Sequence, residues 1–322
     1  MPPMRLGLLV LLLALAHSIV GQELRDPIQT RNHRAISLMF LRMPLGRLPD
    51  STQAKGEWSI DLTIANDLRR IGFLDEDAEL DRISIGRRWS LGADREVWLE
   101  VPILARGSGF LDELIDWWHR NVLRWTDPAR DFTPPRRSTI ALAGEYSFGS
   151  ASGLGDVTIG ATQAFGPRLS ASAALKLPTG DPSRLLGSGS FDAGLSVDYR
   201  APIVRRWSLH AQVGLVAQGA ATRLPSTRGL VDQEALAVIY ARNSRDTWIF
   251  QWQSERSPIV TGVSGADATH RLITIGYRRR LSDRETLELF FSEDRDLFNG
   301  AFPEGANIGP DFTGGIRYRV RF

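Results

Sequence analysis

The sequence predicts an all-β protein, a transmembrane antiparallel β-barrel of about 12–14 strands with one amphipathic helix at about residues 109–125. Three observations predict it. Apolar and polar residues alternate in segments of about ten residues, the length of a tilted strand that crosses a membrane. Short and long connections alternate between the later segments. The chain also begins with an export signal, and no later apolar run is long enough for a spanning helix.

The first 21 residues, MPPMRLGLLVLLLALAHSIVG, have the layout of a secretory signal peptide. Arg5 supplies an early positive charge, an apolar run follows from Leu6 to Leu15, and small residues come next. Cleavage after Ala16 or Gly21 leaves one outer-membrane barrel domain, residues 22–322. A membrane anchor is disfavoured, because a spanning helix needs roughly 20 apolar residues.

Composition excludes several classes of protein. The chain has 39 basic and 37 acidic residues and a formal net charge of +2, so its charge does not favour a nucleic-acid partner. Cysteine is absent, which excludes disulfides, thiolate nucleophiles and cysteine metal sites, and suits folding outside the cytosol.

The alternating segments begin at Trp58 and continue to the C-terminus. Each has apolar residues on one face and small or charged residues on the other, with tryptophan or tyrosine near several ends, where an aromatic girdle would lie. Strands of a soluble β-sandwich are shorter, about five or six residues. The segments lie near 58–65, 82–89, 96–101, 140–148, 157–165, 169–177, 193–199, 209–217, 236–240, 248–252, 273–277, 287–291 and 314–322.

The number of segments leaves two solutions open. There are 13 from Trp58 onward, whereas a barrel with both termini in the periplasm needs an even number. Either residues 32–44, NHRAISLMFLRMP, supply a fourteenth strand, or one segment between residues 97 and 148 lies outside the wall.

Connection lengths predict the orientation of the barrel. Short turns of outer-membrane barrels face the periplasm and long loops face the exterior. The last long loop precedes the final strand, so Phe322 is expected on the periplasmic side. The short connections lie near 166–167, 202–206, 243–246 and 281–284, and the long ones near 178–191, 218–233, 254–269 and 292–312.

Residues 109–125, GFLDELIDWWHRNVLRW, break the strand pattern and predict a helix. Acidic residues lie in its first turn and arginines near its end, which suits the helix dipole. It is either a plug or lid over the pore, or an amphipathic helix that packs on the rim or lies in the membrane interface. If residues 32–44 form a strand, the helix is periplasmic; if they do not, it is extracellular. Its apolar face consists of Leu111, Ile115, Trp118, Val122 and Trp125.

The inner face of the predicted wall carries charges of both signs. Such charges either pair across the lumen and fill it, or line a pore and select the solutes that pass. The lumen-lining candidates are Asp61, Arg82, Arg88, Glu100, Glu145, Lys176, Asp198, Arg200, His210, Arg278, Glu288, Arg317, Arg319 and Arg321.

The sequence predicts no catalytic residue, no cofactor and no metal site. No histidine pair has metal-ligand spacing, and no GxSxG, HExxH or P-loop pattern occurs. DRDLFNG, residues 294–300, lacks the full spacing of a calcium loop and is expected to be a solvated acidic loop. We therefore expect no enzyme; a hydrolase that depends on His210 or His270 is the weakest alternative.

Several stretches resemble a known family. They are GFLDELIDWWH (109–119), GLGDVTIGA (153–161), LKLPTGD (175–181) and LLGSGSFDAGLSVDY (185–199). Over roughly residues 30–322 the chain is similar to an uncharacterised family of Gram-negative outer-membrane proteins, domain of unknown function 3187. LPTGD and GSGSFD also resemble outer-membrane channels associated with the phenol meta-cleavage pathway. The resemblance implies an outer-membrane location.

The C-terminal GGIRYRVRF predicts a last strand whose arginines face the lumen. Its outward residues Tyr318, Val320 and Phe322 resemble the signal that the outer-membrane assembly machinery recognises, although Arg317 stands where a glycine is common. The expected partners are this machinery, periplasmic chaperones, outer-membrane lipid and a small solute of unknown identity.

These features predict a narrow outer-membrane channel for small solutes, hydrophobic or aromatic compounds among them. The alternative is a non-conducting structural or binding barrel. In that case salt bridges and the 109–125 helix would close the lumen.

Overall fold

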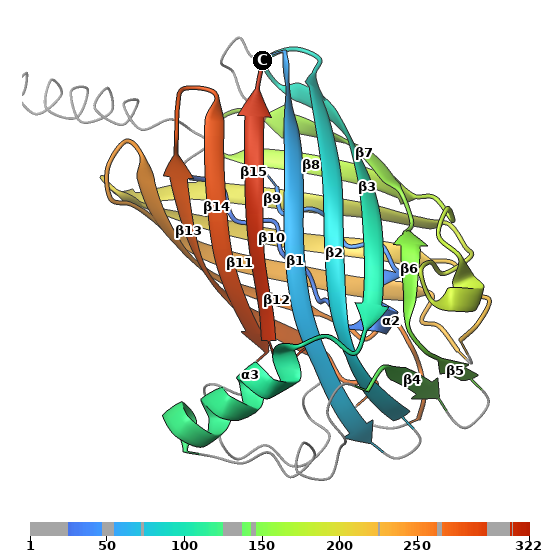
Figure 1. Cartoon of the computed structure of the whole chain (residues 1–322). Coiled ribbons are helices and arrows are strands. Elements are labelled where there is room, and N and C mark those ends of the chain that lie inside the picture. Colours follow the sequence, from blue (N-terminus) through green and yellow to red (C-terminus); the bar gives the residue numbers. More distant parts are fainter. Residues whose placement is uncertain are drawn as a thin grey trace, which may run out of the picture.

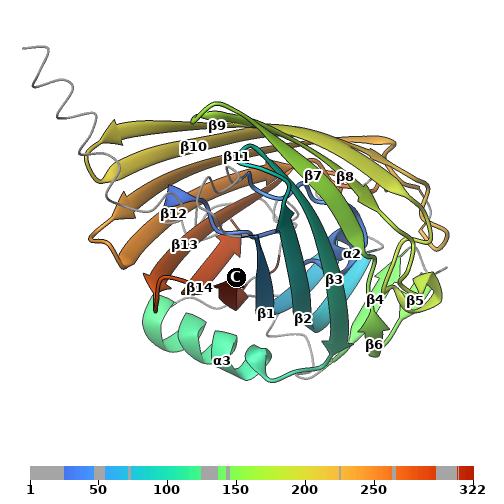
Figure 2. The ribbon, with the colours of Figure 1, turned by 90° about the horizontal axis from the view of Figure 1, so that it is seen from above.

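The computed structural model describes residues 25–46, 55–71, 74–124, 137–142, 146–224, 226–262, 266–294, 310 and 312–322. Within them one β-sheet closes on itself into a barrel, as Figures 1 and 2 show. Twelve of the described strands form the wall, all antiparallel to their neighbours, so the predicted barrel is confirmed. In order around the ring they are β1 (Gly56–Ile71), β2 (Leu74–Ser90), β3 (Arg95–Gly107), β7 (Thr158–Phe165), β8 (Leu169–Lys176), β9 (Asp192–Val204), β10 (Trp207–Gln218), β11 (Leu230–Ala241), β12 (Asp246–Glu255), β13 (His270–Arg280), β14 (Glu285–Asp294) and β15 (Phe312–Arg321).

Strand β1 closes the barrel. One of its edges pairs with β2, and the other pairs with the last strand, β15, where Asp61 lies opposite Arg317. The ring continues from β2 to β3 and from β3 to β7. A closed wall has no free edge, and a sheet surrounded by lipid requires this.

One predicted wall strand, at residues 140–148, lies outside the wall. These residues form β4 (Thr139–Leu142) and β5 (Tyr146–Phe148), which pair with each other, and β4 also pairs with residues 74–77 of β2. A further short strand, β6 (Ala151–Leu154), pairs with the end of β3. The alternative in which one segment between 97 and 148 is not in the wall is confirmed. The reason is that residues 95–100 of β3 already pair with β7, so no gap remains for β4.

Residues 32–44 are not a fourteenth strand. Residues 25–46, which we call the plug segment, run through the inside of the barrel and contain one short helix, α2 (Ala35–Leu38), as Figure 2 shows. Most of its side chains are buried, among them Ile28, Ile36 and Met43, and the others are half-buried. A wall strand would expose alternate side chains to lipid, so the plug segment belongs to the barrel's core.

The two ends of the barrel differ in their connections. The end that holds Phe322, the short-turn end, has connections of two to four residues. The opposite, long-loop end includes residues 177–191, with the 3-10 helix η4 (Pro182–Arg184), and residues 219–229 and 256–269. The predicted alternation of short and long connections is confirmed.

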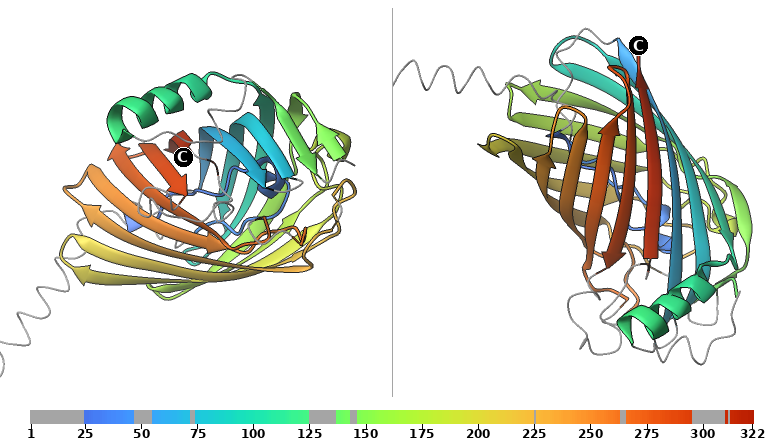
Figure 3. Two further views of the ribbon diagram at one scale, coloured as in Figure 1. Left: turned by 90° about the horizontal axis from the view of Figure 1, so that it is seen from below. Right: turned by 60° about the vertical axis from the view of Figure 1, so that its left-hand side comes forward.

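The predicted helix follows β3 at the long-loop end. It consists of α3 (Leu111–Trp118) and a π-helical continuation, η3 (His119–Leu123); the predicted end at Trp125 lies outside the described residues. Figure 3 shows α3 beside the ring of strands and not across its opening. In the part of the chain that the structure describes, no helix has the length and apolar character needed to cross a membrane.

Candidate functional site in the barrel interior

The wall separates two chemically different faces. On β1, Trp58, Ile60 and Leu62 are exposed on the outside, whereas Asp61 and Thr63 are buried inside. This alternation follows from the pleat of a strand, which points successive side chains to opposite faces. The apolar face meets lipid, and the polar face lines the interior.

The structure buries ten of the lumen-lining candidates on the inner face. Three more, Arg88, Glu100 and Arg321, lie on the same face and are half-buried. Glu145 lies outside the described residues. The buried candidates are Asp61, Arg82, Lys176, Asp198, Arg200, His210, Arg278, Glu288, Arg317 and Arg319.

Glu288 on β14 lies among three arginines. Arg278 Nε and Arg319 Nη2 donate to its Oε1 over 2.7 and 2.6 Å. Arg317 Nη1 lies 3.7 Å from its Oε2 and also pairs with Asp61 across the closing seam. Buried charges are stable only when they are paired and hydrogen-bonded, so this group fixes the inner lining at the seam.

Glutamines on the wall hold the plug segment by its backbone. Gln233 on β11 accepts a hydrogen bond from Met43 N over 2.9 Å and donates one to Leu41 O over 3.1 Å. An amide side chain offers both a donor and an acceptor, so it can satisfy a buried backbone that has no strand partner. Similar bonds run from Gln212, Gln251 and Gln253 to the carbonyl oxygens of Pro44, Ile28 and Thr30.

Buried ion pairs add to this hold. Arg200 on β9 pairs with Asp26 of the plug segment, and Arg34 of the plug segment donates its Nε to Glu76 Oε2 on β2 over 2.7 Å. All four side chains are buried. None of the contacts just described belongs to the hydrogen-bond ladder of the sheet, so release of the plug segment need not open the wall.

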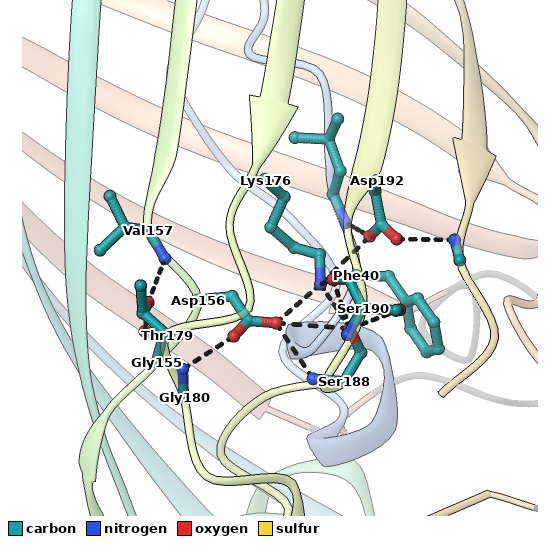
Figure 4. Close-up of polar contacts among 12 residues, drawn as sticks. Phe40, Gly155, Asp156, Val157, Lys176, Thr179, Gly180, Ser188, Ser190 and Asp192 are labelled. Carbon is teal, nitrogen blue, oxygen red and sulfur yellow. Dashed lines mark hydrogen bonds and ion pairs between the residues drawn. The ribbon is translucent and has the colours of Figure 1, made fainter. Parts of the chain in front are cut away.

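The LPTGD and GSGSFD stretches meet at Lys176, the last residue of β8, as Figure 4 shows. The Lys176 Nζ lies 2.6 Å from Asp156 Oδ2 and 3.4 Å from Asp192 Oδ2. It also donates to Ser188 Oγ and to Ser190 O. Lys176 is only 2% exposed, so its ammonium is a buried charge that four oxygen atoms compensate.

Asp192 connects this network to the plug segment. Its Oδ2 accepts a hydrogen bond from Leu41 N over 2.9 Å, and its Oδ1 accepts one from Gly219 N over 3.1 Å. Asp156 accepts in the same way from Gly180 N and from a second backbone N–H of the 177–191 loop. The two sequence stretches therefore join the plug segment to the long-loop end.

An apolar cluster lies inside the long-loop end. There the plug segment packs against the extensions of β1 and β2, against β4 and β5, and against three long loops, and the packed side chains are buried. The larger members of this apolar cluster are Ile36, Met39, Phe40, Leu74, Leu80, Ile140, Phe148, Leu185, Leu224 and Ile259.

A small cavity of about 60 Å³ lies at the short-turn end. Asp61, Trp98, Arg317 and Arg319 of the wall line it, together with Asp26 of the plug segment. The plug segment therefore separates a charged cavity from an apolar cluster.

The His210 candidate lies beside an aspartate that also binds the plug segment. His210 is buried on β10, and its Nε2 lies 3.2 Å from Asp198 Oδ1. Gly46 N of the plug segment donates to that same oxygen over 2.8 Å. Among the described residues, no group of three or more His, Asp or Glu side chains is placed to hold a metal ion.

The helix and assembly candidates lie away from the lumen. Leu111 and Ile115 are buried, whereas Trp118 and Val122 are exposed. Of the residues predicted as an assembly signal, Tyr318 and Val320 lie at the end of β15 and Phe322 directly follows it, with Arg87 Cζ 3.9 Å from the centre of the Phe322 ring.

The plug segment could not be predicted from the strand pattern. The 109–125 helix is the plug candidate in the sequence, whereas residues 25–46 occupy the interior. A signal was present in AISLMFLRMPL (35–45), which is strongly apolar but lacks the alternation of a wall strand.

Comparison with known proteins identifies the family and the fold. A family model described as "Protein of unknown function (DUF3187)" matches residues 26–322. No curated protein matches the chain. Among solved structures it is similar to an outer-membrane channel from Pseudomonas putida F1, with 12% identity, a TM-score of 0.57, and coverage of 85% of this chain and 98% of that one. It is less similar to the CymD monoaromatic hydrocarbon channel, with 11% identity, a TM-score of 0.44, and coverage of 84% and 90%.

The first of these similarities shows a shared outer-membrane barrel fold. The family match extends from the start of the plug segment to the last residue of the chain. This protein therefore belongs to the DUF3187 family, and it shares its β-barrel fold with an outer-membrane channel.

Proposed function

We propose that this protein is an outer-membrane channel for small solutes and that the plug segment closes its resting lumen. The observation that carries the proposal is the position of residues 25–46. They lie inside a closed wall and are held by side-chain hydrogen bonds and ion pairs, not by the sheet. The fold shared with an outer-membrane channel supports it.

The interior favours small solutes with an apolar part, and we propose hydrophobic or aromatic compounds as the class. A solute at the long-loop end meets the apolar cluster, which includes Met39, Phe40 and Phe148. At the short-turn end it reaches a cavity in which Trp98 lies beside paired charges. Such a path suits a flat molecule with one polar group.

We propose that the long-loop end faces the exterior and that Phe322 faces the periplasm, because short turns of outer-membrane barrels are periplasmic. Helix α3 is then extracellular. Export through the signal at residues 1–21 and recognition of Tyr318, Val320 and Phe322 by the assembly machinery remain predictions.

A non-conducting structural or binding barrel is the second candidate. The buried ion pairs favour it, because removal of the plug segment would leave Glu76 and Arg200 without their partners. Breaking a buried pair costs about 3–5 kcal/mol, unless water replaces the partner.

A reversible covalent lock distinguishes the two candidates. The chain has no cysteine, and a Cβ on Gly194 of β9 would collide with the Met43 sulfur. Met43→Cys with Gly194→Cys can therefore join the plug segment to the wall under oxidation. Thr162→Cys with Ser172→Cys, two register partners on β7 and β8, provides a control cross-link within the wall. Conductance in planar bilayers and uptake of aromatic solutes into liposomes are measured before and after reduction.

The channel proposal expects the locked protein to be silent when oxidised and to regain conductance and uptake on reduction. The control pair should conduct in both states. Equal conductance of the plug-locked protein in both states would show that the plug segment does not gate. Absence of conductance and uptake in all reduced proteins would favour the non-conducting barrel.

A further inference from the structure

We infer that the helix formed by α3 and η3, residues 111–123, lies in the membrane interface and inserts its exposed apolar face among the lipids at the long-loop end. Whether the barrel conducts does not matter here, because the helix lies on the outside of the barrel. The acyl chains of the surrounding leaflet would cover its exposed apolar face.

The helix has large apolar side chains that are exposed and do not pack on the barrel. Leu111 and Ile115 are buried and already attach it to the protein. A helix in water would leave few large apolar side chains exposed together. The exposed ones are Phe110 (60%), Leu114 (48%), Trp117 (55%), Trp118 (47%) and Val122 (46%).

The exposed apolar side chains of α3 share one side of the helix. At about 100° per residue, Leu114, Trp117 and Trp118 fall within an arc of ~100°, next to the buried stripe. The acidic residues Asp112 and Asp116 fall on the side away from them. The helix therefore has a buried stripe, an exposed apolar face and a polar face, the arrangement of a helix at a membrane surface.

The attachment of α3 places it on the outer wall. The backbone N–H groups of Phe110 and Leu111 donate to Glu79 Oε2 on β2 over 2.9 and 2.8 Å. Asn66 Nδ2 on β1 donates to Asp112 Oδ1 over 2.9 Å. Asn66 and Glu79 are register partners, and strand alternation places Asn66 on the same face as the lipid-facing Leu62.

A glycine permits this close attachment. Gly109 has φ of +44°, and a Cβ there would collide with the Glu79 carboxylate. The chain can therefore turn out of β3 and begin the helix directly on Glu79.

The position of Asn66 marks one edge of the lipid-facing band. Trp58 lies at the short-turn edge, and the eight residue-to-residue steps from Trp58 to Asn66 span ~27 Å along the strand, or ~21 Å across the membrane at a tilt of ~40°. This is close to the ~25 Å height of the apolar band of outer-membrane barrels. Helix α3 therefore lies where acyl chains give way to headgroups.

The tryptophans agree with this position. On the outer face of β1 and β2, the tryptophans within the described residues are Trp58 and Trp89, both at the short-turn edge. Helix α3 brings Trp117 and Trp118 to the opposite edge. Interfacial tryptophans flank the apolar band on both sides in such barrels.

Single-cysteine probes test the inference, because the chain has no native cysteine. Leu114→Cys places an environment-sensitive fluorophore on the exposed apolar face, and Glu113→Cys places it on the neighbouring, exposed and acidic position as a matched control. Each full-length protein is reconstituted in phosphatidylethanolamine–phosphatidylglycerol vesicles. Quenching is measured with aqueous iodide and with lipids that carry a nitroxide near the headgroup.

The inference expects a blue-shifted emission at position 114, quenching by the nitroxide lipid and loss of iodide quenching, with the opposite pattern at position 113. Iodide access at both positions without nitroxide quenching would overturn it. A blue shift at 114 that depends on protein density and not on the nitroxide would also overturn it, by showing that a second copy covers the face. Heat-dependent gel mobility verifies that each labelled barrel is folded.

Discussion

Leu41 of the plug segment donates its backbone N–H to Oδ2 of Asp192 over 2.9 Å, although 151 positions separate the two residues. The bond connects the centre of the lumen to the start of β9. Asp192 also lies 3.4 Å from Lys176 Nζ, so one carboxylate serves both the plug segment and the buried ammonium. The position of the plug segment therefore depends on the GSGSFD stretch.

The first prediction concerns this carboxylate. Asp192→Ala leaves Leu41 N without its acceptor and Lys176 with one carboxylate, whereas Gly219 N keeps its bond to Phe191 O. We therefore expect a loss of about 3 kcal/mol or more in the free energy of unfolding. We also expect more frequent channel openings, because the plug segment loses an anchor. Urea titration followed by gel mobility and single-channel recording measure the two effects.

Asp181→Ala is the matched control, since it removes an aspartate from the neighbouring LPTGD stretch. Asp181 accepts from Ser183 N and Ser183 Oγ in the exposed loop and caps the short helix η4. Loss of such a cap costs about 1 kcal/mol, and we expect no change in openings. Equal effects of the two substitutions on channel openings would contradict an anchoring role for Asp192.

The second prediction concerns the contact between Gly194 and Met43. Gly194→Leu inserts a side chain where the Met43 sulfur lies, so we expect displacement of the plug segment and higher conductance, with a loss of about 1–3 kcal/mol. Met43→Ala in the same protein makes room and should restore low conductance. Gly229→Leu is the control, because a Cβ at Gly229 meets nothing within 4 Å. A double variant as conductive as Gly194→Leu alone would contradict the contact.

The wall could be predicted from the sequence because lipid and lumen impose opposite chemistry on successive side chains. Trp58, Ile60 and Leu62 alternate with Ser59 and Asp61 for this reason. The same rule was wrong at residues 140–148, where β4 pairs with the tip of β2 and β5 pairs only with β4. An alternating pattern shows that the two faces of a strand meet different surroundings, but it does not show which strand lies beside it.

The interior could be predicted only in part. The alternation along a strand predicts which face carries each charged residue. The partner of that residue depends on how the barrel closes, because closure brings together Asp61 and Arg317, which are 256 positions apart. The plug segment has no period to detect, because side chains such as Ile36 and Met43 are buried whichever way they point. The glutamines that bind the plug segment point into the barrel, and in the sequence they cannot be told apart from the other polar residues of the inner face.

The third prediction concerns charge at the seam. Glu288→Gln removes the carboxylate shared by Arg278, Arg317 and Arg319, so we expect a loss of about 3–5 kcal/mol in the free energy of unfolding. The uncompensated arginines should also shift the selectivity of the open channel towards anions. The reversal potential in a salt gradient measures this shift. Glu285→Gln, a half-buried residue at the start of the same strand, should leave the reversal potential unchanged. A reversal potential of Glu288→Gln equal to that of the unmodified protein would contradict the prediction.

The fourth prediction concerns the effect of acid on the long-loop end. Asp267 accepts hydrogen bonds from Thr261 N and Gly262 N over 2.6 and 2.8 Å. Burial alone would raise the pKa of Asp267, but these hydrogen bonds and one from the Thr261 hydroxyl hold it below its usual range. The same loop places Ile259 and Ala266 in the apolar cluster over the plug segment.

Because the folded loop lowers the pKa of Asp267, its stabilising contribution is complete above the usual aspartate pKa of about 3.9 and is lost as the pH falls through the lower value of the folded loop. We therefore expect amide exchange in residues 256–262, corrected for the intrinsic rate at each pH, and the frequency of channel openings to rise as the pH falls below about 4. Asp267→Asn cannot ionise, so its corrected exchange should be raised already at neutral pH and change little on acidification. A pH response of Asp267→Asn equal to that of the unmodified protein would assign the acid sensitivity to another group.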